Sequence, residues 1–156
     1  MTRLFFLLFV YLNVYSQELS PIQSFKMDDY NASGQNWMIS QSSNGNLFFA
    51  NNDGLLKYNG NKWSLYPSSK ATIIRSVNYI NDKVYTGENT DFGFWTKNTN
   101  GSYSYTSLPV KYNFKLLEDE EFWNILEFKN WIVFQSLNRL VFFDPISDEI
   151  SSIEPD

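Results

Sequence analysis

The stretch that decides the fold is residues 36–67, which read NWMISQSSNGNLFFANNDGLLKYNGNKWSLYP. It holds four short runs of apolar and aromatic residues, separated by turn sequences that contain Asn-Gly or Asp-Gly. These dipeptides between apolar runs favour tight β-hairpins, because such turns need residues that accept a positive φ. The stretch therefore predicts an antiparallel four-stranded meander with strands at 37–41, 47–50, 55–58 and 63–66.

Two weaker copies of this unit follow along the chain. Residues 83–95 repeat the middle of the first unit about 36 positions later, and residues 131–143 repeat it roughly 48 positions further on. Such periods with four strands each are typical of propeller blades, whereas helical repeats would show apolar residues at a spacing of 3.6. The sequence predicts an all-β fold, an incomplete β-propeller of about three four-stranded antiparallel blades, near 36–67, 72–108 and 121–154.

Three blades do not close a ring, because propellers usually have four to eight. The chain has 156 residues and is rich in aromatic side chains, so it can bury a core. We therefore expect either that it belongs with the remaining propeller blades of a longer protein, or that copies of it assemble to cover the open blades.

The first 16 residues have the features of a secretory signal peptide. One arginine precedes an apolar run at 4–12, and small or modest side chains precede Gln17. The run is too short to span a bilayer, which needs about 20 residues. We expect an exported, periplasmic protein with no membrane span in its mature part; a buried first strand or core helix is the alternative. Residues 17–35 read as an extended lead-in that can form a short strand at 22–25, the outer strand of the last blade of a longer protein.

Composition narrows the classes of function. The net charge is −5 and the pI about 4.7, which argues against nucleic acid or an anionic membrane surface as a partner of this segment. Histidine and cysteine are absent, and no cofactor or metal motif is present. The acidic run at 118–121 is interpreted as a solvated turn rather than a cation site. Carboxylates that could pair for catalysis lie mostly in turns, so we predict no enzymatic activity; they are Asp53, Glu88, Asp91 and Glu118.

The sequence offers a few candidate ligand-binding residues and no candidate catalytic or metal-binding residue. Arg75 stands in an otherwise apolar strand, so it needs a partner or must point into the central channel. Pairing with a carboxylate such as Glu88 is the structural alternative. The five tryptophans, among them Trp123, can stack on a sugar, although aromatic residues in strands more often pack between blades. The candidates are thus Arg75, Glu88 and Trp123.

A set of short motifs resembles the start of the periplasmic sensor propeller in Bacteroidetes two-component-regulator-propeller proteins that also carry a triple-tyrosine domain. The resemblance implies an exported propeller that senses a small molecule or glycan. A β-sandwich, a transmembrane helix and an output module, either a LuxR-like helix-turn-helix or a hybrid histidine kinase, would then follow. This chain ends after three blades, so signalling and DNA binding are not assigned to it. The motifs lie at residues 35–39, 49–63, 75–77, 85–87, 92–95, 122–125 and 134–137.

The expected function is therefore an extracytoplasmic ligand-sensing segment of a signal-transduction or transcriptional regulator. A stand-alone secreted carbohydrate- or protein-binding module is the main alternative. An inert product of a split gene is a third possibility.

Overall fold

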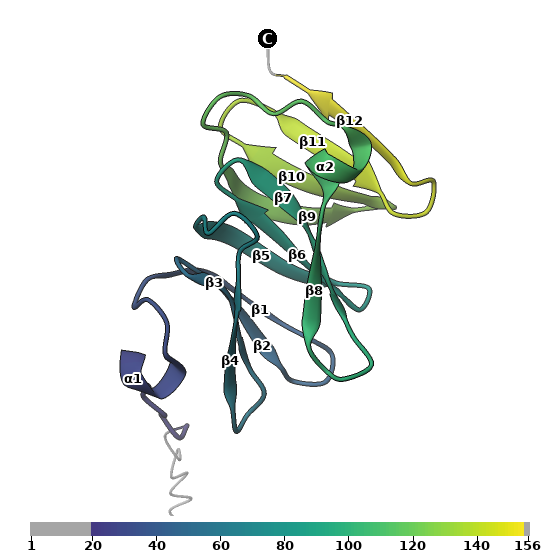
Figure 1. The fold of residues 1–156 in the computed structure, drawn as a ribbon. Helices are drawn as coiled ribbons and strands as arrows, with labels where there is room; N and C mark the ends of the chain where they lie inside the picture. The colour runs from purple at the N-terminus through teal and green to yellow at the C-terminus, as the bar shows by residue number, and fades with distance from the viewer. Residues whose placement is uncertain (1–19, 155–156) are drawn as a thin grey trace, which may run out of the picture.

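Three four-stranded antiparallel sheets follow one another through the molecule (Figure 1). The computed structural model describes residues 20–154, so the predicted signal peptide at 1–16 lies outside the described residues. In each sheet the strands are paired in chain order, as expected for propeller blades. The predicted fold class, an all-β partial propeller of three blades, is confirmed.

Blade one, blade two and blade three are the three sheets in chain order. The strands of blade one are β1 (Asn36–Gln41), β2 (Leu47–Asn51), β3 (Gly54–Tyr58) and β4 (Trp63–Pro67). Those of blade two are β5 (Ile74–Ile80), β6 (Lys83–Glu88), β7 (Asp91–Lys97) and β8 (Tyr103–Ser107). Those of blade three are β9 (Phe122–Phe128), β10 (Trp131–Ser136), β11 (Leu140–Asp144) and β12 (Glu149–Ile153).

The turn residues explain why each hairpin closes where it does. Asn81 and Asp82 connect β5 to β6 with φ values of 49° and 62°, a conformation that Asn and Asp tolerate better than most residues. Gly54 has a φ of 141°, and a Cβ atom there would lie 2.3 Å from the carbonyl oxygen of Tyr66. The turn sequences thus fix the register of the strands that they connect.

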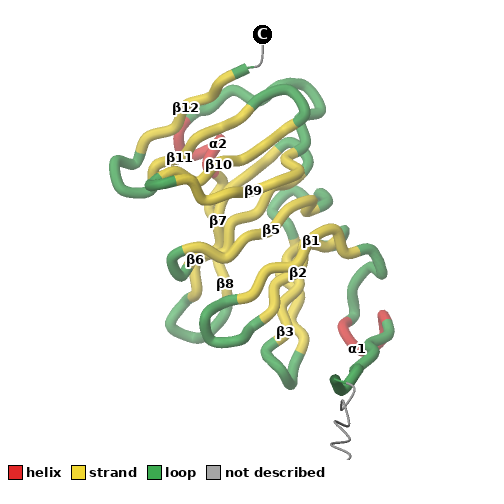
Figure 2. Tube along the Cα trace, turned by 180° about the vertical axis from the view of Figure 1, so that it is seen from behind, coloured by secondary structure: helices red, strands yellow, loops and turns green. Residues whose placement is uncertain are grey.

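The first strands of the three blades lie side by side at the centre of the assembly (Figure 2). Side chains link them: the amide of Tyr79 in β5 donates to Oγ of Ser40 in β1 (2.9 Å), and Nδ2 of Asn78 donates to the carbonyl of Ile125 in β9 (3.1 Å). These contacts hold β1, β5 and β9 side by side with the same chain direction. We call the end at which β1, β5 and β9 begin the starting end, and the opposite end the far end.

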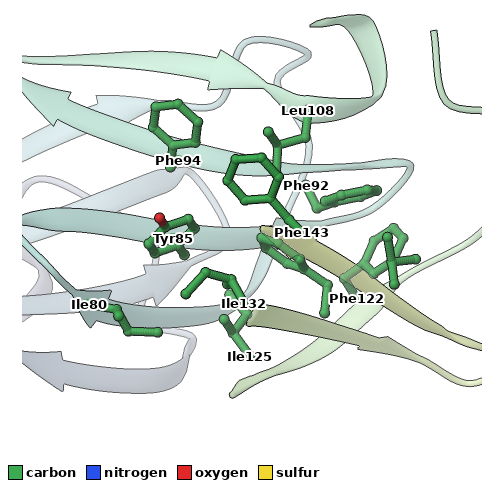
Figure 3. Close-up of a cluster of buried hydrophobic side chains, with 11 residues drawn as sticks. Ile80, Tyr85, Phe92, Phe94, Leu108, Phe122, Ile125, Ile132 and Phe143 are labelled. Carbon is green, nitrogen blue, oxygen red and sulfur yellow. The ribbon is translucent and has the colours of Figure 1, made fainter. Parts of the chain in front are cut away.

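Apolar side chains fill both spaces between blades. Between blades two and three, Phe92 lies against Phe122 (4.5 Å between ring centroids) and Phe134 (4.8 Å), as part of the cluster in Figure 3. Between blades one and two, Phe48 and Trp95 belong to a second buried cluster. Buried aromatic rings contribute large apolar areas, so these two clusters hold the blades together.

Two short helices lie outside the sheets. The lead-in forms α1 (Met27–Tyr30) and no strand at 22–25, so the predicted short strand is wrong. Phe25 packs instead on the rings of Tyr58 and Trp63, both 5.1 Å away, which favours burial of this side chain over strand pairing. In the connection between blades two and three, α2 (Leu108–Tyr112) is capped by Ser107. Among residues 20–154, no helix is long and apolar enough to cross a membrane.

Candidate functional site

The first strand of each blade is irregular near the starting end. There, its pairing with the second strand skips one residue. The pairing of β1 with β2 skips Trp37, that of β5 with β6 skips Arg75, and that of β9 with β10 skips Trp123. An extra residue of this kind makes a β-bulge, which bends the strand and re-aims the side chain. Equivalent bulges in three blades therefore direct these three side chains away from the regular alternation.

The three side chains meet. The guanidinium carbon of Arg75 lies 4.3 Å from the ring centroid of Trp37 and 4.8 Å from that of Trp123. Oε1 of Glu121 accepts hydrogen bonds from Nη2 (2.9 Å) and Nε (3.3 Å) of Arg75, and Nε1 of Trp37 donates to Oδ1 of Asn52 (2.8 Å). One cation is thus held by two indoles and a carboxylate. We call Trp37, Arg75, Glu121 and Trp123 the arginine cluster.

The arginine cluster is partly open to solvent. Trp37 is 41% exposed, whereas the side chains of Arg75 and Glu121 are 13% and 23% exposed. Nε1 of Trp123 is buried, and neither it nor Nη1 of Arg75 has a hydrogen-bond partner among residues 20–154. The cluster can therefore offer an aromatic face and N–H donors to a polar ligand with a ring.

Arg75 pairs with a carboxylate, as expected, but this carboxylate is not that of Glu88. Arg75 pairs with Glu121 of the next blade, whereas Glu88 lies opposite Ile74 and accepts hydrogen bonds from Ser68 and Thr72. The bulge directs Arg75 toward blade three and away from the neighbouring strand that carries Glu88. Sequence reasoning missed Glu121, because nothing in an acidic run shows which member meets a cation.

Glu88 belongs to a buried group that we call the Glu88–Asp91 corner, at the turn from β6 to β7. The two residues flank the turn, as expected, but both carboxylates are 0% exposed. Oδ1 of Asp91 accepts a hydrogen bond from Ser107 (2.7 Å), but Oε1 of Glu88, Oδ2 of Asp91 and the hydroxyl of Tyr105 have no hydrogen-bond partner among the described residues. The ammonium of Lys70 is 3.9 Å from Oδ2. Burial raises the pKa of Glu88 to about 7 and also raises that of Asp91.

The acidic run at 118–121 divides between two roles. Glu118 and Asp119 are exposed, as expected of a solvated turn, but Glu120 is buried and forms an ion pair with Arg139 (2.7 Å). Burial opposes ionisation of Glu120, yet hydrogen bonds led by that of Arg139 lower its pKa. The interpretation of this run as a solvated turn is therefore wrong for Glu120 and Glu121, because the linker that carries them enters between two blades.

The other tryptophans pack within the structure. Trp95 is 3% exposed and donates to Oγ1 of Thr86 (2.9 Å) in the cluster between blades one and two. Trp63 packs against the lead-in, and Trp131 lies edge-on to Phe142. Trp37 and Trp123 are the pair that flank a cation. Within residues 20–154, no three carboxylate, imidazole or thiol groups gather as a metal site would require.

Comparisons with known proteins show the fold. No protein-family model and no curated protein matches the chain. Among solved structures, it is similar to two crystal structures of the extracellular domain of BT4673 from B. thetaiotaomicron, named a one component system in one and a hybrid two component system in the other. The first has a TM-score of 0.60 at 17% identity over 80% of this chain, and the second 0.57 at 18% over 79%. This chain spans 16% of the length of either.

Proposed function

We propose that the chain is an extracytoplasmic, ligand-sensing propeller segment of a bacterial signal-transduction or transcriptional regulator. The observation that carries the proposal is the convergence of Trp37, Arg75 and Trp123 from three separate blades. The similarity in fold to two extracellular domains supports it. In this proposal the segment reaches the periplasm by the signal at 1–16 and has no catalytic activity. Further sequence supplies a membrane helix and either a helix-turn-helix or a kinase.

The ligand in this proposal is a small molecule or a glycan that binds at the arginine cluster. The open face of Trp37 can stack on a sugar ring, and the free N–H groups of Arg75 can donate to hydroxyl oxygens. Trp123 packs on the guanidinium and edge-to-face against Trp37, so its role is positioning. Glu88 is fully buried in the neighbouring corner and lies outside this proposed contact surface.

The outer blades support the view that further blades pack on this segment. On blade three, Leu126 and Phe128 are 54% and 56% exposed beside Phe142, and on blade one Ile39 is 55% exposed. The equivalent spaces between blades one, two and three are filled with apolar side chains. Exposed apolar patches of this kind mark surfaces that bind protein. We propose that the remaining blades of a longer regulator cover them.

The same uncovered faces also fit the second candidate, a stand-alone secreted carbohydrate- or protein-binding module closed by other copies of itself. Light scattering of the purified chain distinguishes the two. A defined oligomer favours the stand-alone module. A monomer whose downstream DNA encodes further blades and a transmembrane helix favours the regulator segment.

Ligand binding at the arginine cluster is tested on the full chain with a panel of neutral and charged mono- and oligosaccharides. Tryptophan fluorescence and the melting temperature are measured for the wild type, Trp37→Ala and the matched control Trp131→Ala, whose tryptophan lies at the far end. We expect a ligand whose affinity falls about tenfold in Trp37→Ala, equivalent to about 1.4 kcal/mol, and stays unchanged in the control. Equal affinities in the two variants, or no ligand for the wild type, would contradict the site.

A further inference from the structure

A second hollow lies between blades one and two, at the far end of the sheets. It is a cavity of about 400 Å³, whose lining includes Asn44, Tyr79, Asp82, Thr96, Lys97 and Tyr103. Asp82 follows β5 and Arg75 is the second residue of this strand, so at roughly 3.3 Å per residue the cavity is about 20 Å from the arginine cluster. It is therefore separate from the candidate site described above.

The aromatic wall of this cavity packs on a buried phenylalanine. Tyr79 stacks on Phe48 with 6.0 Å between ring centroids and an interplanar angle of 6°. Tyr103 meets the same phenylalanine edge-on at 5.6 Å, and it also contacts Tyr66 at 5.5 Å. Phe48 is 0% exposed, so both tyrosine rings rest on a fixed core residue. The wall is thus preformed, and binding would not have to order it.

Two lysines bring positive charge to the cavity. Lys97 lines it, and the ammonium of Lys57 lies 5.2 Å from the ring centroid of Tyr103. Neither lysine forms an ion pair with a carboxylate of residues 20–154. Burial lowers the pKa of Lys57, and the charge of Lys97 lowers it further. Two like charges that repel each other in this way would both be stabilised by one anion between them.

The remaining polar groups of the cavity are mostly unused donors. The side chains of Lys97 and Thr96 and the hydroxyl of Tyr103 form no hydrogen bond within the described part of the chain, and the side-chain amide nitrogen of Asn44 is also free there. Asp82 is the carboxylate in the lining, and its Oδ1 already accepts the hydroxyl of Tyr79 (2.7 Å). The cavity therefore offers more donors than acceptors, next to two cations.

We propose that this cavity, here called the lysine groove, binds a small organic anion. Its carboxylate or sulfate group lies between Lys57 and Lys97, its hydroxyl groups accept from Asn44 and Thr96, and its carbon skeleton rests on Tyr103. The proposal does not depend on ligand binding at the arginine cluster, because the two sites lie at opposite ends of the strands.

The test compares glucuronate with glucose, which share a ring but differ in the carboxylate, and adds inorganic sulfate to separate charge from skeleton. Binding to the full chain is followed by NMR, through the side-chain amide of Asn44 and the ε-methylene signals of the lysines. We expect glucuronate to bind at least tenfold more tightly than glucose and more tightly than sulfate. Its affinity should fall several-fold as salt rises, and its binding should raise the pKa of Lys57.

The variants are Lys97→Met and Lys57→Met, with Lys129→Met in blade three as the matched control. Lys129 also lies over an aromatic ring, that of Phe128 at 5.4 Å, but far from the groove. We expect either groove variant to weaken glucuronate binding about tenfold, with circular dichroism unchanged, and the control to have no effect. Equal binding of glucose and glucuronate would overturn the proposal, as would binding of sulfate alone or an equal effect of the control variant. The absence of any response at Asn44 up to about 50 mM glucuronate would also overturn it.

Discussion

Blades two and three connect the second strand to the third through equivalent corners, and the two corners are held in opposite ways. In blade three, Ser136 and Arg139 lie at the two sides of the turn, and Glu120 from the incoming linker bonds to both. In blade two the same two positions carry Glu88 and Asp91, and the linker offers the hydroxyl groups of Ser68 and Thr72 to Glu88, while its half-exposed Lys70 stays 3.9 Å from Asp91. One corner contains a complete ion pair, and the other contains two buried acids.

The comparison shows that geometry repeats between blades while charge does not. Each corner attaches a linker to a hairpin. The two corners also contact each other, because the backbone amide of Thr90 donates to the carbonyl of Glu120 (2.8 Å) and Asn89 forms an isolated β-bridge with Glu121. Glu121 holds Arg75. Backbone contacts therefore join the corner of blade two to the segment that carries Glu121 of the arginine cluster.

The largest effect is expected where the complete corner is broken. Arg139→Met leaves Glu120 buried without its cation, and removal of one partner of a buried pair costs about 3–5 kcal/mol. Urea unfolding measures the loss in the free energy of unfolding. The exposed pair of Lys111 and Asp148 provides the control, because Lys111→Met should change little. Similar losses for both variants would mean that the corner of blade three is not a special support.

Glu88→Gln should stabilise the protein at high pH. The pKa of Glu88 is about 7 in the folded chain against 4.5 as the reference, so the folded state binds more protons between these values. Stability therefore falls as the pH rises from about 4.5 to 7 and is flat, in this respect, above 7. Glutamine removes this loss, and its amide can donate to Asp91 or Tyr105. We expect a gain of up to about 3 kcal/mol at pH 8 and almost none at pH 4.

Thermal melts of the wild type and the Glu88→Gln variant between pH 4 and pH 9 provide the measurement. Parallel curves for the two proteins would show that Glu88 does not titrate in this range.

Replacement by alanine should have different effects at the residue that precedes each corner. A Cβ atom on Gly87 would lie 2.4 Å from Oγ of Ser76 and 2.6 Å from the carbonyl oxygen of Phe122, so Gly87→Ala should cost about 1–3 kcal/mol. The equivalent residue of blade three, Gln135, is exposed, and Gln135→Ala should be nearly neutral. Chemical denaturation of both variants tests the pair, and a neutral Gly87→Ala would contradict the close approach of blades two and three.

The smallest effect is expected at the cation beside the two acids. Lys70 is 43% exposed and 3.9 Å from Asp91, so Lys70→Met should change stability by less than about 1 kcal/mol. It should also raise the pKa of Asp91 further, because Lys70 is one of the groups that favour its ionised form. A carbon-detected NMR titration of the Asp91 carboxyl measures this shift. An unchanged pKa would show that Lys70 does not act on the corner.

Local sequence patterns sufficed to predict the strands, because the two strands of a hairpin are joined by a turn of only a few residues. Asn81 and Asp82 turn between β5 and β6 as their types predict, and the apolar runs beside them form the strands. Arg75 was singled out for the same kind of reason, since a charge in an apolar strand must be compensated. The strand predicted at 22–25 is absent because Phe25 packs on a ring 33 positions later, that of Tyr58, and no local pattern shows this contact.

The sequence by itself determined that this protein is a row of repeated four-stranded sheets, because turn chemistry and the alternation of apolar residues act over a few positions. Only the tertiary structure decided which charges meet. The Arg75–Glu121 pair joins residues 46 positions apart, and Glu88 and Asp91 are buried by a linker from the preceding blade. Burial and pairing of charges depend on distances between blades, and these are set by how the sheets pack on one another.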